Sequence, residues 1–415
     1  MSGPFLNPQR LRDYPRLFLV SSWLVILLNV LLSQGWNGGL TGIMLFGDFI
    51  SYYAGGMLFR TDASLLYDPM AQQALQEALI APTVSAGFAP FISTPYVALA
   101  YGLLTALPLG WALGLWLGLS LVFAAAAVHL LGRSLLPGWL KAQGLTTVQL
   151  GVVIASCFAF VIGMQAGQNH TLTLLLVTGV VIACRGEKWA LAGLLAGLLA
   201  YKPQFALGFV VVWLVWRRWQ ALAAFGLTAG AWVGAALLTG GLGPYLAYLD
   251  FSQWLMLLPY AGDNFPVSIM ATPYALLASL IPLSALGVFK VAYYLAAAAL
   301  TLGLALYAYR QRQAGAAGRD AALALAIFYP LLSMPHTLVY DLLILVPVFL
   351  LAAQEKQGAG RLLLPAVGAY LGTLFLPLAG YPLQAALSAL IPLGVFAALA
   401  GWLGRHGVRR TEEPL

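Results

Sequence analysis

Residues 111–132 read WALGLWLGLSLVFAAAAVHLLG, an unbroken run without a single Asp, Glu, Lys or Arg. A helix of roughly 17–25 apolar residues spans the hydrocarbon core of a bilayer, so this run predicts a transmembrane helix. The whole chain has the same character, because 61% of its 415 residues are hydrophobic and 8% are charged. Soluble domains carry about 25% charged residues, and a chain this poor in charge cannot cover a water-facing surface. We therefore expect a polytopic integral membrane protein.

Similar apolar stretches recur along the chain and leave no segment large enough for a separate soluble domain. They predict an all-α fold, a single domain over residues 1–415, with a bundle of about 11–13 transmembrane helices. Two shorter pieces, 92–108 and 268–283, are expected to span, to re-enter or to lie on the surface. The expected helices cover residues 17–34, 111–132, 147–163, 170–184, 188–202, 204–217, 221–239, 286–308, 321–334, 337–353, 361–377 and 383–404.

The basic residues stand in short clusters between apolar segments, a pattern typical of the cytoplasmic loops of membrane proteins. The net charge of +7 therefore reflects topology, and no single basic face forms that would bind nucleic acid. The first apolar run is expected to be an uncleaved helix whose N-terminus is cytoplasmic. The clusters are Arg10/Arg12/Arg16, Arg185/Lys188, Arg217/Arg218, Arg310/Arg312/Arg319, Lys356/Arg361 and Arg405/Arg409/Arg410.

This orientation places the connection 35–91, the region 240–285 and several short polar turns on the outer side of the cytoplasmic membrane. The number of crossings between residues 92 and 184 has two possible solutions. If Arg133 and Lys141 are inside, 92–108 is re-entrant; if 92–108 crosses, some segment between 133 and 184 is not a simple span. Two amphipathic pieces, 49–59 and 69–80, are expected as short helices along the membrane surface, where they would form a lid with 240–285.

Asp48 follows Phe46 and Gly47 at the outer end of the first helix and precedes Phe49. A carboxylate between aromatic side chains at the membrane boundary is partly desolvated, which raises its pKa. Such a group suits a general base that takes a proton from a hydroxyl. An equally simple interpretation is that Asp48 caps the following helix, because Asp is a favoured N-cap. The two roles are compatible.

Tyr67, Asp68 and Pro69 predict a turn that opens the second amphipathic helix, with Asp68 as the cap and Pro69 at the first helical position. We regard Tyr67 and Asp68 as supporting residues of the candidate site. Tyr52 and Tyr53 are candidate substrate contacts, although tyrosines here are also typical of the membrane interface.

Lys202 interrupts an apolar stretch and is followed by Pro203, which ends the helix. An isolated lysine at membrane depth is costly and indicates a functional role, here a phosphate ligand, unless the side chain extends to the interface. Gln168, Asn169 and His170 stand together between two apolar helices and offer donors and acceptors for a sugar or phosphate. Their alternative role is a plain polar turn.

His336 occupies a further outer turn after Pro335, and Asp341 lies inside the next apolar helix, where a carboxylate needs a partner. A base and cationic groups on one side of the membrane predict sugar transfer from a lipid-phosphate carrier. The alternative is a transporter or flippase of a lipid-linked sugar. The sequence indicates no cofactor; Asp62 and Asp68 near Asp48 allow a divalent ion but do not require one.

Several short motifs in this order give the chain a family resemblance, which covers about residues 17–353. It resembles the polyprenyl-phosphate-dependent membrane glycosyltransferases of family 87, which have a GT-C fold. The motifs are Gly47-Asp48-Phe49 with Tyr52-Tyr53-Ala54-Gly55, Leu66-Tyr67-Asp68-Pro69, Ser93-Thr94-Pro95 with Ala98-Leu99, Gly167-Gln168-Asn169, Ala192-Gly193 with Lys202-Pro203-Gln204, and Ser333-Met334-Pro335-His336 with Tyr340-Asp341.

The resemblance implies an inverting enzyme on the outer face of the cytoplasmic membrane, where a polyprenyl-phosphate sugar is the donor and a lipid or glycan the acceptor. Characterised relatives use polyprenyl-phosphate mannose and form α-1,2 links. The family's catalytic aspartate matches Asp48, its lysine-proline motif matches Lys202 and its late histidine matches His336. Lys202 and His336 would then hold the donor phosphate. We count Gln204 of the same motif with Tyr52, Tyr53, Gln168, Asn169 and His170 as substrate contacts.

Overall fold

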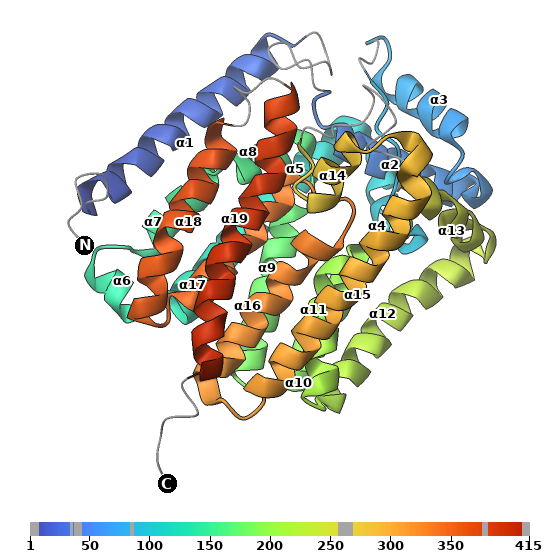
Figure 1. Cartoon of the computed structure of the whole chain (residues 1–415). Coiled ribbons are helices and arrows are strands. Elements are labelled where there is room, and N and C mark those ends of the chain that lie inside the picture. The colour runs from blue at the N-terminus through green and yellow to red at the C-terminus, as the bar shows by residue number, and fades with distance from the viewer. Residues whose placement is uncertain are drawn as a thin grey trace.

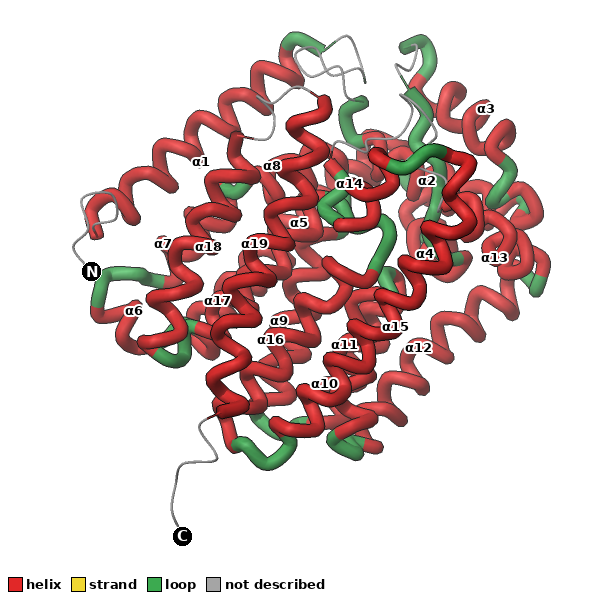
Figure 2. The backbone as a smooth tube through the Cα atoms, in the orientation of Figure 1, coloured by secondary structure: helices red, strands yellow, loops and turns green. Residues whose placement is uncertain are grey.

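A computed structural model of the chain describes residues 8–33, 36, 44–83, 87–255, 269–375 and 381–408. Its helices pack side by side into one bundle (Figures 1 and 2). Among the described residues, six helices are long and apolar enough to cross a membrane, or up to seven spans if a bent pair counts as one. Within these described ranges there is no β-strand, but Met270 and Leu338 form an isolated bridge. The structure confirms the all-α polytopic membrane class.

The expected helices are found close to their predicted positions, because Gly, Pro and basic residues end the apolar runs. The bounds are α1 (Pro8–Leu31), α2 (Gly47–Thr61), α3 (Pro69–Ile80), α4 (Pro95–Gly102), α5 (Leu109–Leu130), α6 (Gly138–Ala142), α7 (Thr147–Ser156), α8 (Phe158–Ala166), α9 (His170–Arg185), α10 (Trp189–Leu198), η4 (Leu199–Tyr201), α11 (Gln204–Val215), α12 (Trp219–Gly240), α13 (Gly243–Leu255), α14 (Pro273–Leu280), α15 (Leu286–Gln311), α16 (Gly315–Ser333), η9 (Val339–Ile344), α17 (Leu345–Ala352), α18 (Lys356–Phe375) and α19 (Tyr381–Val408).

Two ends of the bundle can be told apart by their charges. At one end, which we call the basic end, Arg185 pairs with the buried Asp320 at 3.1 Å, and Arg319 pairs with Glu187 at 2.8 Å. These pairs tie the C-terminal end of α9 to the start of α16. The opposite end carries the turns that follow α8, η4 and α16, and we call it the site end.

The path of α5 decides how the segment 92–108 runs. Leu107, just before α5, accepts a hydrogen bond from Tyr53 Oη at 2.8 Å, whereas Ser134, just after α5, accepts one from Arg185 at the basic end. The segment also begins at the site end, because Ser93 accepts a hydrogen bond from Tyr67. Both ends of 92–108 therefore lie at the site end, so α4 enters and returns without crossing.

The return crossing is made by α7 and α8 together, which meet at a 63° bend. Cys157, between them, is in an extended conformation that ends α7 and starts α8. Gln149 near the start of α7 donates to the carbonyl of Arg12, so α7 begins beside the N-terminal end of α1. The stretch 92–132 thus crosses once, through α5, and α7 with α8 crosses back. One crossing is the odd number that Arg133 and Lys141 require if both are inside.

The first amphipathic piece is a helix as predicted, but α2 lies deeper than a surface helix, with eleven of its residues buried. Glycines make this burial possible. A Cβ on Gly56 would lie 2.6 Å from the backbone nitrogen of Gly102, and one on Gly55 would lie 2.5 Å from the Phe91 ring. The α2 backbone therefore packs directly against α4, which brings the start of α2 into the bundle.

The second piece, α3, starts as the sequence predicts. Asp68 is its N-cap and accepts a hydrogen bond from the backbone N–H of Ala71, and Pro69 occupies the first turn. In Figure 1, α2, α3, α4, α13 and α14 gather at the top and right of the view. The region 240–285 was expected to form a lid with α2 and α3. The structure describes 240–255 and 269–285 of it; residues 256–268 lie outside the described ranges.

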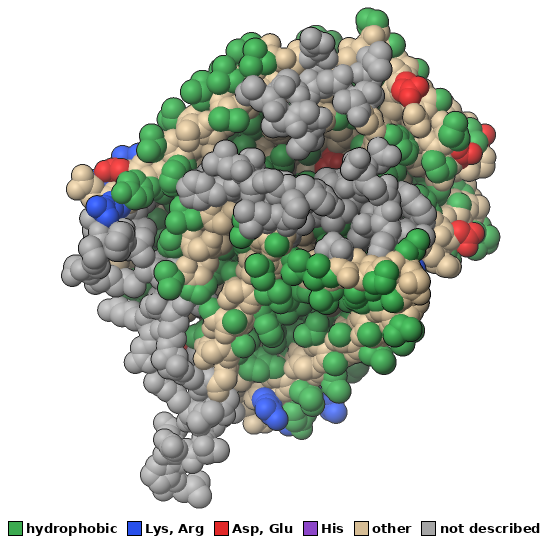
Figure 3. All heavy atoms as spheres, turned by 45° about the horizontal axis from the view of Figure 1, so that its top comes forward, with side chains coloured by type: hydrophobic (Ala, Val, Ile, Leu, Met, Phe, Trp, Pro, Cys, Tyr) green, Lys and Arg blue, Asp and Glu red, His purple; other side chains and the backbone are tan. Residues whose placement is uncertain are grey.

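The outer faces of the long helices are apolar. Val288 of α15 and Leu227 of α12 are each 78% exposed, and hydrophobic side chains cover much of the described face in Figure 3, with Lys and Arg near its edges. Exposed apolar area on this scale is not tolerated in water. These faces are therefore lipid-facing, while the short helices α9, α10 and α11 form much of the buried core.

Candidate active site

The turn after α8 places Gln168 at the site end. Gly167 has a φ of 70°, the left-handed conformation that glycine adopts without strain. Its N–H bonds to the carbonyl of Met164 at 3.1 Å, and the N–H of Gln168 bonds to the carbonyl of Gly163 at 2.9 Å. This pair of bonds is the Schellman pattern of a helix C-terminus. It fixes the backbone at Gln168.

Asp48 reaches the same place from the other direction. The N–H of Phe46 donates to the carbonyl of Gln165 in α8 at 2.9 Å, which ties the start of α2 to the end of α8. The N-cap of α2 is Phe46, without a side-chain cap, so the capping interpretation of Asp48 is wrong. The carboxylate is free of a capping bond and instead accepts a hydrogen bond from Gln168 Nε2 at 2.9 Å.

Gln168 joins three segments of the chain. Its Nε2 also donates to Tyr340 Oη at 2.8 Å, and its Oε1 accepts from Tyr52 Oη at 2.9 Å and from the N–H of Asn169 at 2.9 Å. Tyr52 is further held by stacking on Tyr101, with ring centroids 4.6 Å apart. The helix α2, the turn after α8 and the start of η9 therefore meet at the side-chain amide of Gln168.

The residue after Tyr340 carries the second half of the site. Asp341 Oδ1 accepts a hydrogen bond from Lys202 Nζ at 2.8 Å, and both side chains are largely buried. Asp341 Oδ2 accepts the N–H of Leu338 at 3.3 Å, which orients the carboxylate. Lys202 Nζ also lies 5.1 Å from the centroid of the Tyr340 ring, so a cation–π contact links the two halves.

We call the connected set the Asp48–Lys202 cluster. It consists of Asp48, Tyr52, Gln168, Lys202, Tyr340 and Asp341. Asp48 lies outside the membrane-spanning helices, and burial raises its pKa to about 6, against the lowering effects of the Gln168 hydrogen bond and the Lys202 charge. This carboxyl is therefore poised to exchange a proton near neutral pH.

His336 lies close to the ion pair in the turn between α16 and η9. Burial lowers the pKa of His336, with the Asp341 charge acting in the opposite direction. Its imidazole is thus neutral, and its Nδ1 is buried without a hydrogen-bond partner in the described structure. The turn is supported by residues that follow the undescribed 256–268 segment: Ala271 N–H donates to the carbonyl of Thr337 at 2.6 Å, and Thr272 donates to that of Pro335.

Two further predicted contacts flank the cluster. Asn169 and His170 are buried beside Gln168; His170 Nδ1 lies 3.2 Å from the Gln168 carbonyl oxygen, and its Nε2 is without a partner in the described chain, as is Asn169 Oδ1. A Cβ on Gly163 would lie 2.5 Å from the His170 ring, so this glycine provides the space for it. These unpaired polar atoms belong to the two residues that follow Gln168 in the chain.

Other predicted residues are not in the cluster. Tyr53 donates to the carbonyl of Leu107 and so holds the re-entrant segment, and Tyr67 donates to the carbonyl of Ser93 at 2.6 Å. Asp68 is a helix cap, and Gln204 opens α11 in a partly buried position. Asp62, one of the carboxylates that would allow a metal, instead bonds the backbone and side chain of Ser64.

Sequence reasoning did not select Tyr340 or Trp116 as site residues. Tyr340 accepts a hydrogen bond from Gln168. The sequence signal that could have identified it as a site residue was its place in the Tyr340-Asp341 motif. Trp116 Nε1 donates to the carbonyl of Gly167 at 2.8 Å and so supports the turn from α5. Nothing in the local sequence distinguishes this tryptophan from those at the membrane interface.

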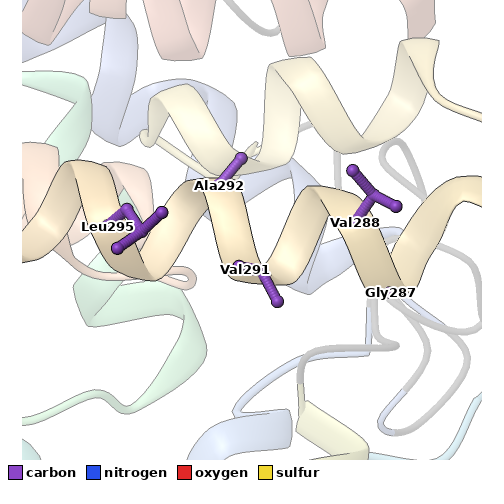
Figure 4. A pocket seen from close by; sticks show the side chains of 5 residues that line it. All are labelled: Gly287, Val288, Val291, Ala292 and Leu295. Atoms are coloured by element: carbon purple, nitrogen blue, oxygen red, sulfur yellow. The ribbon is translucent and has the colours of Figure 1, made fainter.

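Figure 4 shows a pocket lined by Gly287, Val288, Val291, Ala292 and Leu295 of α15. All five lining residues are apolar, and α15 contributes no residue to the Asp48–Lys202 cluster. Its position on a lipid-facing helix fits contact with acyl chains rather than chemistry.

The model of glycosyltransferase family 87 matches residues 91–335, more than half of the chain. No curated protein and no solved structure matches the chain. The matched range contains Gln168, Asn169, His170, Lys202 and Gln204; it begins after Asp48 and ends just before His336. Together with the polytopic helix bundle and its buried polar cluster, this match shows that the chain belongs to glycosyltransferase family 87.

Proposed function

We propose that this glycosyltransferase moves a sugar, with mannose as the expected one, from a polyprenyl-phosphate donor to a lipid or glycan acceptor. The observation that carries the proposal is Asp48, a carboxyl with a pKa raised to about 6, held by Gln168 beside the Lys202–Asp341 pair. A base and a cation in one enclosed cluster suit a reaction that takes a proton from one substrate while negative charge develops on another.

In the proposed step, Asp48 takes the proton from an acceptor hydroxyl. The hydroxyl oxygen bonds to the anomeric carbon from the side opposite the phosphate, and the bond between that carbon and the phosphate oxygen breaks. The electron pair of the broken bond leaves with the polyprenyl phosphate, and the anomeric configuration is inverted. The proton on Asp48 is then released to water or to the phosphate, which restores the base.

Lys202 is the proposed partner of the departing phosphate. Its ammonium group is held at 2.8 Å by Asp341, so it is positioned before any substrate binds. Burial makes the attraction between an ammonium and a phosphate stronger than in water. His336 would add a neutral hydrogen-bond donor from its unpaired Nδ1 rather than a second positive charge.

Asn169 and His170 are the proposed sugar contacts. Each has a buried polar atom without a partner in the described structure, Asn169 Oδ1 and His170 Nε2. Leaving such atoms unpaired is costly, and sugar hydroxyls would satisfy them. Asp48, Lys202 and these two residues would then surround the anomeric carbon.

The location proposed for the reaction is the outer face of the cytoplasmic membrane. The Asp48–Lys202 cluster lies at the end of the bundle opposite Arg185 and Arg319. Basic residues between apolar helices favour the cytoplasmic side. The proposal includes no metal, because Lys202 supplies the positive charge and Asp62 and Asp68 are engaged as caps.

The test is Asp48→Asn, which keeps the shape of the side chain and removes the base. Purified protein in detergent is incubated with labelled polyprenyl-phosphate mannose and a lipid acceptor, and both sugar transfer and released polyprenyl phosphate are measured. We expect transfer to be abolished in a variant that elutes and unfolds like the wild type. Unchanged turnover would exclude Asp48 as the base.

Asp62→Asn is the matched control. Asp62 lies in the same part of the chain and is exposed, and within the described residues its carboxylate accepts hydrogen bonds from Ser64 alone. Its replacement should leave transfer at the wild-type rate.

A further inference from the structure

The hydrogen bonds of Gln168 leave none of its amide free for a substrate. A primary amide offers two N–H donors and an oxygen with two lone pairs. Both donors are used, on Asp48 Oδ2 and Tyr340 Oη, and the oxygen accepts from Tyr52 Oη and from the N–H of Asn169. Gln168 is also only 3% exposed. A substrate hydroxyl would have to break an existing bond to reach it.

The direction of the amide is determined by its surroundings. The backbone N–H of Asn169 can only donate, so the atom facing it at 2.9 Å must be the oxygen. The NH2 group then necessarily faces the carboxylate of Asp48 and the phenol of Tyr340. An amide in this direction stabilises the charged form of Asp48, because the bond is a donor to a carboxylate.

We infer that Gln168 is a positioning residue that orients Asp48 as the base, rather than a ligand of the substrate. This replaces its expected role as a substrate contact, and it rests on the proposed function of Asp48. Gln168 is itself held by neighbouring elements: Trp116 of α5 donates a hydrogen bond to the carbonyl of Gly167, and Tyr52, which bonds to Gln168, stacks on Tyr101. Such support by neighbouring side chains is what keeps a catalytic group in one orientation.

The inference predicts a particular kinetic pattern for Gln168→Glu. Glutamate has the same length and retains an oxygen for Tyr52 and Asn169, but it replaces the donor to Asp48 by a second carboxylate oxygen. We expect kcat to fall about ten- to a hundredfold, the effect of losing a hydrogen bond to a charged group. The KM for the donor should not change. The acidic limb of the pH–rate profile should move to higher pH, because the charged form of Asp48 loses its donor and gains a like charge.

Gln168→Met is the second variant, since it removes the amide without adding charge. It should also lower kcat and move the acidic limb upward, by less than Gln168→Glu. Gln72→Met is the matched control: Gln72 is another buried glutamine that bonds on both sides, to the Leu66 carbonyl and the Phe91 N–H, but contacts no member of the Asp48–Lys202 cluster. Its replacement should lower the unfolding temperature and leave the acidic limb in place.

Several results would overturn the inference. A raised KM with unchanged kcat would make Gln168 a substrate ligand. A lower unfolding temperature with an unmoved acidic limb would make it a structural residue, as would failure of both Gln168 variants to fold when Gln72→Met folds. If Asp48→Asn is inactive but Gln168→Glu matches the wild type, the inference fails and the proposed function stands. If Asp48→Asn is active, the proposed function itself fails.

Discussion

The pH dependence of transfer tests the environment of Asp48. Burial raises the pKa of this carboxyl to about 6 from its ordinary 3.8. A general base works only when deprotonated, so activity is lost as the pH falls through the folded-state pKa. About nine tenths of the Asp48 groups are ionised at pH 7 and about one tenth at pH 5, so kcat/KM should fall about tenfold across this interval. An ordinary carboxyl would leave kcat/KM nearly unchanged over the same range.

The assay measures kcat/KM for labelled polyprenyl-phosphate mannose in detergent from about pH 4.5 to about pH 8, which brackets the expected limb. The phosphodiester of the donor keeps its single negative charge throughout, so the limb reports the protein. Unfolding at low pH is the competing cause of lost activity. A carboxyl whose pKa is raised in the folded state adds stability at low pH and loses that contribution as the pH rises, so Asp48 itself does not promote acid unfolding.

Samples held at about pH 5 and returned to about pH 7 should therefore regain full activity, since protonation of Asp48 reverses. A profile that stays flat between pH 5 and pH 7, in a protein whose Asp48→Asn variant is inactive, would refute the reasoning. It would mean that the carboxylate is solvated in the working enzyme and that its aromatic surroundings do not control its protonation.

Two further predictions concern the support of the site. Asp341→Asn leaves Lys202 buried without its counter-ion and should cost about 3–5 kcal/mol of stability, seen as a lower unfolding temperature. The double variant with Lys202→Met should recover part of that loss, and additive losses would contradict a direct pair. Gly167→Ala should abolish transfer and lower the unfolding temperature, because a Cβ would lie 2.6 Å from that of Phe49 in a left-handed backbone. Gly144 also has a left-handed backbone, but a Cβ there would meet open space. Gly144→Ala should therefore lower the free energy of unfolding by only about 1–2 kcal/mol, from backbone strain, and leave the enzyme active.

The positions of the helices could be predicted from the sequence because each long apolar run must satisfy its backbone within itself in lipid. The start of α3 was equally predictable, since Asp68 and Pro69 fix it locally. The depth of α2 was not. Its burial depends on contacts with α4 through Gly55 and Gly56, and a sequence pattern does not show which partner a helix face will meet.

The candidate site was predictable in most of its members but not in their bonds. Asp48, Lys202 and Asp341 are conspicuous because charge is rare in this chain. The pairing of Lys202 with Asp341 and the role of Gln168 are not visible in the sequence, since they depend on turns that lie far apart along it. Tyr53 shows the converse case: its motif suggested a substrate contact, but its hydroxyl bonds to the Leu107 carbonyl.

The separation of the bonded residues along the chain has a consequence for biosynthesis. Gln168 bonds to Asp48 across 120 residues and to Tyr340 across 172. A nascent chain emerges from its N-terminus, so Asp48 and Lys202 are inserted long before Tyr340 and Asp341 are made. Until then Asp48 has an incomplete set of neighbours and Lys202 lacks its counter-ion. The last third of the protein therefore completes the Asp48–Lys202 cluster, and a ribosome-bound intermediate that stops before residue 340 would hold most of the family's sequence motifs without the geometry of this cluster.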